Sequence, residues 1–137
     1  MRIALFFLLL TTGLISCKNS TVKLLSKKWD CVQVENLQPI DTKFQSKEDS
    51  VKAIQIEAAL KELNWTFETN MEYRCGIGDR TTLRGTYALS DNDKTLTCIP
   101  ETKNNVNTYT IKALSENELQ LTSMETAAGI TLHFRPH

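Results

Sequence analysis

The sequence predicts a mainly β protein: an eight-stranded antiparallel up-and-down barrel with one helix between its first and second strands. Two observations predict this fold. From Trp65 onward, apolar and polar residues alternate with a period of two, as in strands with one buried face. The strand candidates are joined mostly by short segments rich in Asn, Asp, Ser and Gly, which are typical of turns. Closing such a meander into a barrel removes its exposed edges, and an open sandwich is the alternative.

The N-terminus has the features of a secretory signal peptide, which we place at residues 1–16. Arg2 supplies a positive charge, and residues 3–10 are an unbroken apolar run that is too short to span a bilayer. The following Leu-Ile-Ser-Cys resembles the lipobox of bacterial lipoproteins, in which the cysteine becomes the lipid-modified first residue. Cys17 is therefore the predicted lipid attachment site. The alternative is an ordinary signal peptide followed by a free or disulfide-bonded cysteine.

The lipid anchor predicts where the protein works. Two or three acyl chains, palmitate among them, hold a protein on a membrane far more firmly than one chain does. Residues 17–24 are polar enough to form a tether, which leaves 25–137 as the barrel domain. The tether lacks the acidic run found in surface-exported lipoproteins. We therefore expect a bacterial cell-envelope protein, anchored in the outer membrane and facing the periplasm.

The strands are expected to follow one another along almost the whole barrel domain. We place them at about 27–35, 64–68, 71–75, 82–89, 95–99, 107–114, 118–124 and 129–135. Their alternation puts one set of mostly large apolar side chains on the inner face. This set comprises Trp29, Trp65, Phe67, Met71, Tyr73, Tyr87, Leu89, Leu96, Tyr109, Ile111, Leu119, Leu121, Ile130, Leu132 and Phe134.

The long connection from Glu35 to Leu63 contains the predicted helix, at about 47–63. It begins with a sequence that resembles a capping box, Ser-Lys-Glu-Asp, and Glu57 and Lys61 have the spacing of a helical ion pair. Two apolar stripes fall on roughly opposite sides of this helix. One is Ala53, Ile56, Leu60 and Leu63, and the other is Val51, Ile54 and Ala58. We expect one stripe to pack on the barrel, which leaves the other for a loop, a ligand, a partner or water.

Several segments of the chain together resemble the lipocalin-like domain of small bacterial lipoproteins of the Bacteroidetes. They are Leu-Ser-Lys-Lys-Trp at 25–29, Trp-Thr-Phe-Glu-Thr-Asn at 65–70, Gly-Thr-Tyr-Ala-Leu-Ser-Asp-Asn-Asp-Lys-Thr-Leu-Thr at 85–97 and Tyr-Thr-Ile-Lys-Ala-Leu-Ser at 109–115. The resemblance implies that Trp29 closes the floor of the barrel and that Arg135 stacks over it as a structural plug. Lys27 stands where the opening motif of the family has glycine.

Three cysteines remain once Cys17 carries lipid: Cys31, Cys75 and Cys98. Their spacing fits no zinc site, so no metal is expected. In an oxidising envelope we expect one disulfide and one buried thiol. The Cys75–Cys98 pair is favoured, since both residues are expected toward the same end of their strands.

Charge and residue chemistry exclude other classes of function. The chain has 16 Lys and Arg against 16 Asp and Glu, so it offers no broad cationic surface, and no nucleic-acid partner is expected. Its two histidines, His133 and His137, are expected on the surface, and neither is placed to serve a nucleophile. We therefore expect neither an enzyme nor a cofactor.

The leading functional hypothesis is a small hydrophobic or amphipathic ligand held in a shallow calyx near the barrel mouth. The first connection must cross the end opposite the Trp29 floor, so its helix is placed as a lid over the calyx. The predicted ligand-binding residues are Ile56, Leu60, Leu63, Trp65, Phe67, Tyr73 and Tyr87. The alternative is a filled barrel that presents the helix to an envelope protein partner, as an interaction or inhibitor module.

Overall fold

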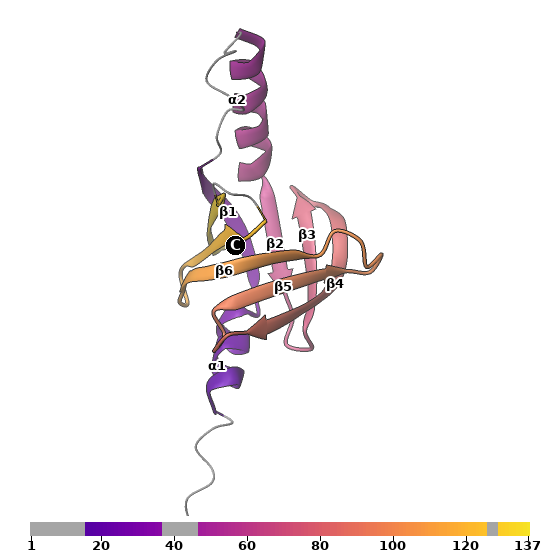
Figure 1. Cartoon of the computed structure of the whole chain (residues 1–137), viewed down its shortest axis with the longest axis vertical. Helices are drawn as coiled ribbons and strands as arrows, with labels where there is room; N and C mark the ends of the chain where they lie inside the picture. The colour runs from indigo at the N-terminus through magenta and orange to yellow at the C-terminus, as the bar shows by residue number, and fades with distance from the viewer. Residues whose placement is uncertain (1–15, 37–46, 126–128) are drawn as a thin grey trace, which may run out of the picture.

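The computed structural model describes residues 16–36, 47–125 and 129–137. They form a closed antiparallel barrel in which each strand pairs with the next and the last pairs with the first (Figure 1). The elements are α1 (Ser16–Leu25), β1 (Lys28–Glu35), α2 (Lys47–Lys61), β2 (Leu63–Phe67), β3 (Glu72–Ile77), β4 (Arg80–Ser90), β5 (Thr95–Pro100), β6 (Asn107–Leu114), β7 (Leu119–Ser123) and β8 (Thr131–Pro136). The predicted barrel with a helix between its first two strands is confirmed, and the open sandwich is wrong.

The barrel closes between β1 and β8. Cys31 lies opposite Phe134, and Val34 lies opposite Leu132 in this antiparallel pair. The register shifts between Cys31 and Gln33, so Val32 is the extra residue of a bulge and is 45% exposed. A bulge of this kind bends its strand and increases the local twist, which helps a sheet to curl into a barrel.

The segment after Cys17 is helical, which the tether prediction missed. In α1 the last turn carries Leu25, which is fully buried under the barrel. The backbone N–H of Ser26 donates to the carbonyl oxygen of Val22 at 2.9 Å, and so does the Ser26 hydroxyl at 2.6 Å. Packing of the last turn against the barrel therefore stabilises a short helix whose polar residues alone favour no helix. Residues 1–15 of the predicted signal peptide lie outside the described residues.

The predicted inward set does form the core of the barrel. Ten of its members are buried, and the other five, such as Met71 and Tyr109, are partly buried and pack against them. Sequence periodicity missed several members of the same core, which are Leu25, Cys31, Val34, Leu63, Cys75, Leu83, Cys98 and Leu114. Cysteine behaves as a small apolar side chain in such positions.

The central stretch of the chain has two local features that explain its sequence. In the turn between β4 and β5, Asp91, Asn92 and Asp93 have φ values of 53°, 55° and 63°, a left-handed conformation that Asn and Asp tolerate better than most residues. At Gly85 a Cβ atom would overlap the carbonyl oxygen of Ile99 in β5. Glycine at position 85 thus allows the backbones of β4 and β5 to approach closely.

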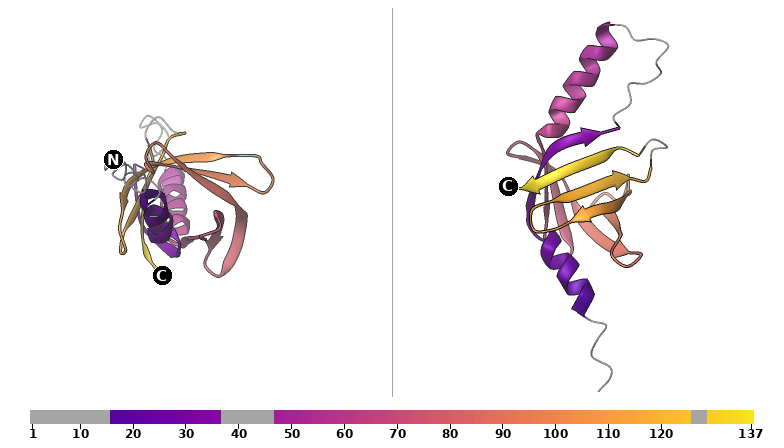
Figure 2. Two further views of the ribbon diagram at one scale, coloured as in Figure 1. Left: turned by 90° about the horizontal axis from the view of Figure 1, so that it is seen from below. Right: turned by 90° about the vertical axis from the view of Figure 1, so that its left-hand side faces the viewer.

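Because consecutive strands are antiparallel, the connections lie alternately at one end of the barrel and at the other. We call one the α1 end; it holds the start of β1 and the β2–β3, β4–β5 and β6–β7 turns. The other is the α2 end, which holds the start of β2 and the β3–β4, β5–β6 and β7–β8 connections. The two helices project from opposite ends of the molecule (Figure 1) and overlap when it is seen along its long axis (Figure 2).

Candidate functional site

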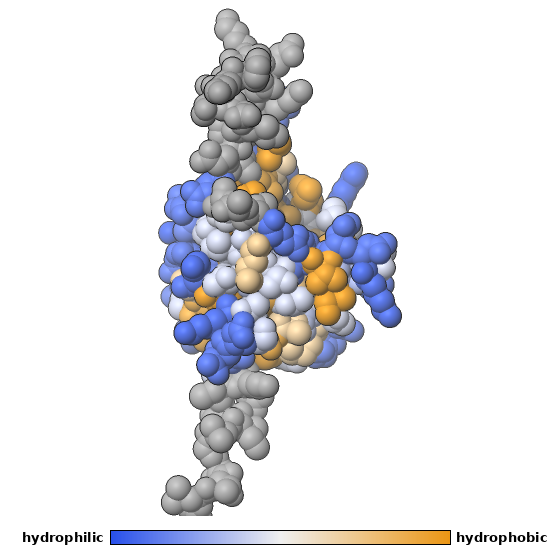
Figure 3. Space-filling model, in the orientation of Figure 1, coloured by the Kyte–Doolittle hydropathy of each residue, from blue (hydrophilic) through white to orange (hydrophobic). Residues whose placement is uncertain are grey.

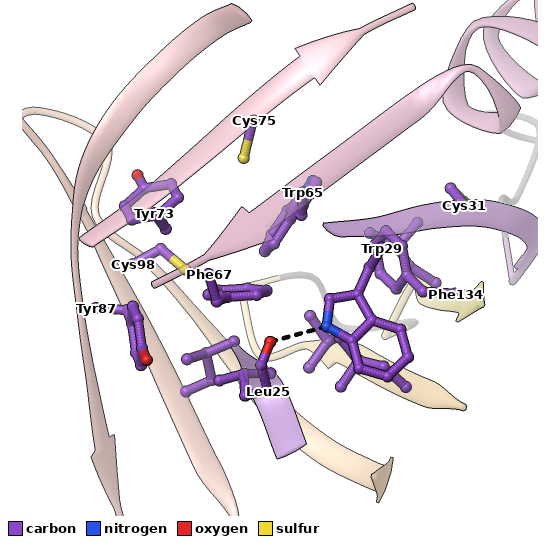
Figure 4. Packing of buried hydrophobic residues seen from close by; sticks show 14 residues of the cluster. Leu25, Trp29, Cys31, Trp65, Phe67, Tyr73, Cys75, Tyr87, Cys98 and Phe134 are labelled. Atoms are coloured by element: carbon purple, nitrogen blue, oxygen red, sulfur yellow. Dashed lines mark hydrogen bonds between the residues drawn. The ribbon is translucent and has the colours of Figure 1, made fainter. Parts of the chain in front are cut away.

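The α1 end is sealed by a tryptophan plug. Trp29 is fully buried, and its indole Nε1–H donates to the carbonyl oxygen of Leu25 at 2.9 Å, which ties α1 to β1 (Figure 4). Lys27 Nζ lies 5.1 Å from the centroid of the Trp29 ring and also donates to the carbonyl oxygen of Glu116 at 3.0 Å. Trp29 thus lies buried beside α1 at this end of the barrel, the position that the predicted floor requires.

Arg135 does not stack over Trp29, so that prediction is wrong. Phe134 points into the core, and the alternation of the strand therefore turns Arg135 outward, where it is exposed. Its neighbour across the β1–β8 pair is Asp30, which also has outward parity. Lys27, the residue that replaces the glycine of the family motif, supplies the cation over Trp29 instead.

The structure brings the four predicted wall residues together inside the barrel. Ring centroids are 5.8 Å apart for Trp65 and Phe67, 6.5 Å for Phe67 and Tyr73, and 5.2 Å for Phe67 and Tyr87. Each of the four side chains is at most 5% exposed. These rings contact one another directly, and so they fill the part of the interior that they line.

The predicted Cys75–Cys98 disulfide is not formed; Cys31, Cys75 and Cys98 are free and buried. Strand β4 separates β3 from β5, and strands on either side of a third lie about 10 Å apart. Cys75 lies opposite Leu83 of β4, whereas Cys98 lies opposite Tyr87. This separation exceeds the span of about 7 Å between the Cα atoms of bridged cysteines.

Burial holds the three thiols in their neutral form. It raises the pKa of Cys75 to about 12, and it raises the pKa values of Cys98 and Cys31 as well. Burial also raises the pKa values of Tyr73, Tyr87 and Tyr109. A thiol with a raised pKa is a poor nucleophile and a poor metal ligand, because both roles need the thiolate.

The predicted lid residues do not lie together over the barrel mouth. Helix α2 rises away from the barrel along the long axis (Figure 2), and Ile56 is 52% exposed. Only the junction is covered: Leu60 is half-buried, and Leu63 begins β2 and packs against the core. The helix has apolar residues on opposite sides, so no single face is apolar enough to hold it flat against the strand ends.

Exposed apolar side chains gather at the α2 end. In the described part of the chain, seven large hydrophobic residues are exposed, and all but Val32 belong to α2, to the last position of β3 or to the connections at this end. They are Val51 (53%), Ile54 (66%), Ile56 (52%), Ile77 (43%), Val106 (41%) and Met124 (58%). Figure 3 shows apolar side chains where α2 joins the barrel and a second apolar cluster lower on the barrel, among hydrophilic side chains.

Comparison with known proteins supports the architecture alone. Neither a sequence-family model nor a curated protein sequence matches the chain. A solved lipocalin-like protein from Bacteroides uniformis is similar over 83% of this chain and 99% of its own, with a TM-score of 0.52 and 16% identity.

Two other solved structures give the same result. A DUF4847 family protein from Bacteroides vulgatus has a TM-score of 0.53 and 14% identity over 82% of this chain and 93% of its own. An uncharacterized protein from Bacteroides eggerthii also has a TM-score of 0.53, with 12% identity over 82% of this chain and 99% of its own. This chain has a lipocalin-like fold. The resemblance drawn from the sequence motifs is thereby confirmed at the level of the fold.

The lipocalin-like barrel also carries two grooves on its outer surface. One, of about 670 Å³, is lined by residues of β3, β4, β5 and the adjoining turns. Its charged residues are three acids and three bases, namely Glu68, Glu72, Glu101, Arg74, Arg84 and Lys103. The other, of about 680 Å³, lies beside the β1 bulge and includes His133 and Arg135. Both grooves carry the polar side chains of a solvated outer face.

The described residues contain no helix with both the length and the apolar character needed to cross a membrane. Nor do they contain a group of three or more His, Cys, Asp or Glu side chains arranged to hold a metal ion.

Proposed function

We propose that this protein is a non-enzymatic, lipid-anchored protein of the bacterial cell envelope that docks a protein partner through the α2 end of its lipocalin-like barrel. The observation that carries the proposal is the concentration of exposed apolar side chains at that end. Contiguous apolar surface on a soluble domain marks a contact site more often than isolated exposed residues do. A filled aromatic interior and neutral thiols further favour a display role over catalysis.

Anchoring at Cys17 fits this arrangement. The lipobox-like sequence predicts the acyl chains at Cys17, in the first turn of α1, and the two helices project from opposite ends of the molecule. A lipid at Cys17 would therefore leave the α2 end directed away from the bilayer. We propose the outer membrane, facing the periplasm, as the location. Mass spectrometry of the mature protein should find a diacylglyceryl group on Cys17, and Cys17→Ser should release the protein; membrane retention of that variant would contradict anchoring.

The chemistry of α2 suggests the kind of partner. Val51 and Ile54 lie on one side of the helix, and Ile56 lies on the other. All three are more than half exposed, so a partner must contact two sides of the helix at once. A protein with a deep apolar groove that receives a helix has this geometry. Ile77, the last residue of β3, and Met124, which follows β7, are exposed at the same end of the barrel.

A site-specific cross-linking experiment tests the docking. A photoreactive residue at position 54 in the full-length protein, expressed in its native envelope, should give one discrete protein adduct. The same probe at Gln33, which is exposed on β1, should not. With the photoreactive residue moved to position 56, the added substitution Ile54→Glu should abolish the adduct, whereas Gln55→Glu, a charge on a neighbouring exposed position of α2, should leave it unchanged.

Three results would overturn the docking proposal. They are equal adducts from positions 54 and 33, an adduct of only a second copy of the same chain, and an adduct that survives Ile54→Glu. Circular dichroism of the variants checks that α2 and the barrel remain folded, so that loss of an adduct reports on the contact itself.

Binding of a small hydrophobic or amphipathic ligand is a second candidate function, favoured by one buried group. The Nε1–H of Trp65 has no hydrogen-bond partner among the described residues, although its atom is shielded from solvent. Such a donor is usually paired in a folded protein, so an acceptor from outside the chain would relieve it. Native mass spectrometry of protein from its own envelope tests this candidate, which fails if nothing co-purifies and no ligand binds.

A further inference from the structure

The outer groove beside the β1 bulge follows the seam at which β1 and β8 close the barrel. It has a volume of about 680 Å³ and is lined by residues from both strands of this seam and from the β6–β7 turn. The turn supplies Ser115 and Asn117 at the α1 end, and β1 supplies Val32 and Gln33 at the bulge. The groove is therefore separate from the barrel interior and from the exposed surface of α2.

The groove contains a guanidinium group without a partner. Arg135 is exposed there, and Asp30 lies opposite it in the β1–β8 pair. The Oδ2 atom of Asp30, however, is 2.7 Å from the Nδ1 atom of His137. Within residues 16–36, 47–125 and 129–137, Arg135 makes no ion pair. A guanidinium carries five N–H donors in a planar fork and can hold a carboxylate through two of them, so Arg135 can receive a carboxylate from another molecule.

The acidic side chains beside the groove already accept hydrogen bonds. Glu118, which lines the groove, accepts one from Nε2 of Gln120, and Glu35 accepts one from Nε2 of Gln33 at 3.3 Å. The side-chain amide of Asn117, by contrast, makes no hydrogen bond within the part of the chain that the structure describes. An amide N–H can donate to an anion. The available donors of the groove thus suit a negatively charged group.

The bulge adds an apolar side chain to this polar groove. Val32 is the extra residue of the bulge and is 45% exposed. Bulges re-aim side chains and are frequent next to functional sites. Pro136, at the end of β8, is exposed and lines the same groove. An apolar molecule can therefore contact Val32 and Pro136 while its acidic group reaches Arg135.

We infer that this groove binds a small organic monocarboxylate, with its carboxylate held by Arg135 and its apolar body against Val32. One unpaired guanidinium balances one negative charge. A phosphate monoester carries nearly two negative charges and would meet the carboxylates of Glu118 and Glu35, so it fits less well. The site lies outside the α2 end and outside the barrel interior, so it rests on neither proposed function.

Three naphthyl compounds test the inference on the full mature protein. They are 2-naphthoate, its methyl ester and 2-naphthyl phosphate, which share the ring and differ in charge. The acid should bind at least about tenfold more tightly than the ester, because a hydrogen bond to a charged group contributes at least that factor. The phosphate should bind more weakly than the acid. In ¹⁵N NMR titrations the acid should shift the Nε–H signal of Arg135 and the backbone N–H signal of Val32, and it should leave the indole signal of Trp65 in place.

Substitutions separate the charge from the apolar contact. Arg135→Gln should weaken binding of the acid about tenfold and leave binding of the ester unchanged. Arg84→Gln, which removes an exposed arginine of β4 that does not line this groove, should retain the preference for the acid. Val32→Ser should weaken binding of the acid and the ester by the same factor. Circular dichroism checks the fold of each variant, and the NMR titration of the unmodified protein decides the question where a variant fails to fold.

Four results would overturn the outer site. They are equal affinity for the acid and the ester, a preference for the acid that survives Arg135→Gln, tighter binding of the phosphate than of the acid, and no binding of the acid up to its solubility limit. A fifth result also contradicts the site: an acid that shifts the indole signal of Trp65 and leaves the Arg135 signal in place would lie inside the barrel. That result would support the second proposed function while overturning this inference.

Discussion

The α1 end and the α2 end of the barrel use apolar side chains in opposite ways. At the α1 end, Leu25 and Trp29 are fully buried, and a hydrogen bond joins the helix to the strand. At the α2 end, Ile54 and Met124 are 66% and 58% exposed. Burial at one end stabilises the fold, whereas exposure at the other end contributes little to it. This difference between buried and exposed apolar side chains is the basis of the proposed docking at the α2 end.

Substituting alanine at one position of each end gives the largest expected contrast. Trp29→Ala removes a fully buried ring and a hydrogen bond, and it should lower the free energy of unfolding by about 3 to 5 kcal/mol. Ile54→Ala removes an exposed side chain, and it should change the same quantity by less than about 0.5 kcal/mol. Urea unfolding followed by circular dichroism measures both. Similar costs at the two positions would break the comparison.

Leu25→Ala tests whether α1 belongs to the folded domain. Leu25 is fully buried in the last turn of α1, so we expect a loss of about 2 to 4 kcal/mol in the free energy of unfolding. Leu60→Ala is the matched change near the end of α2, where the side chain is only half-buried, and it should cost about 1 kcal/mol. A negligible effect of Leu25→Ala would mean that α1 is a detachable tether after all.

Raising the pH should lower the free energy of unfolding, because it removes protons from the buried thiols between the two ends of the barrel. The pKa of Cys75 is about 12 in the folded protein against an ordinary value of 9.0, so the folded state keeps a proton that the unfolded state loses. This stabilisation is fully present below about pH 9 and is lost as the pH rises toward 12, by about 1.4 kcal/mol per pH unit for each such thiol.

Urea unfolding of the reduced protein at pH 7, 9 and 10.5 measures this dependence. Cys75→Ala should make the decline above pH 9 shallower, and an unchanged slope would argue against a buried neutral thiol at this position. Alkylation provides a second check, because the mature protein should label at Cys31, Cys75 and Cys98 only after unfolding.

The smallest expected change in the free energy of unfolding concerns Lys27, whose ammonium group lies over the Trp29 ring. Lys27→Met removes the charge above Trp29 and the hydrogen bond to Glu116, so we expect a loss of about 0.5 to 1 kcal/mol. Arg135→Met should have no measurable effect, since Arg135 is exposed and turned away from the ring. Unfolding at low and high salt compares the two variants. A larger loss in the free energy of unfolding for Arg135→Met than for Lys27→Met would support the stacking of Arg135 on Trp29 that the family resemblance implies.

The order of the strands and the inward side chains could be predicted because both depend on a local pattern. A period of two marks one face of a strand wherever it occurs, and Trp65 and Phe134 are both in the core as expected. The same alternation also predicts that Arg135 points outward. Phe134 points inward, and neighbouring residues of a strand face opposite sides of the sheet. The family resemblance and the parity disagreed there, and parity was the better guide.

The remaining errors concern contacts between elements that are far apart in the sequence. Helix α1 depends on the burial of Leu25 under a barrel that forms later in the chain. The direction of α2 depends on its few contacts with β1, and the two cysteines of the expected disulfide are separated by a strand. The unpaired donor of Trp65 has no signature in the sequence, because it reflects the absence of a nearby acceptor among the described residues.

Helix α1 also fixes a rotational phase between residue 17 and the barrel. In an α-helix each residue turns the chain by about 100° and advances it by about 1.5 Å. Deleting one residue from the first half of α1 would thus swing any group attached at Cys17 to another side of the molecule, while Leu25 kept its place under the floor. Deleting four residues, about one turn, would bring the group back to within about 40° of its original direction at a distance about 6 Å shorter. Helix α1 therefore sets the direction of a group attached at Cys17 relative to the barrel, as well as its distance from the barrel.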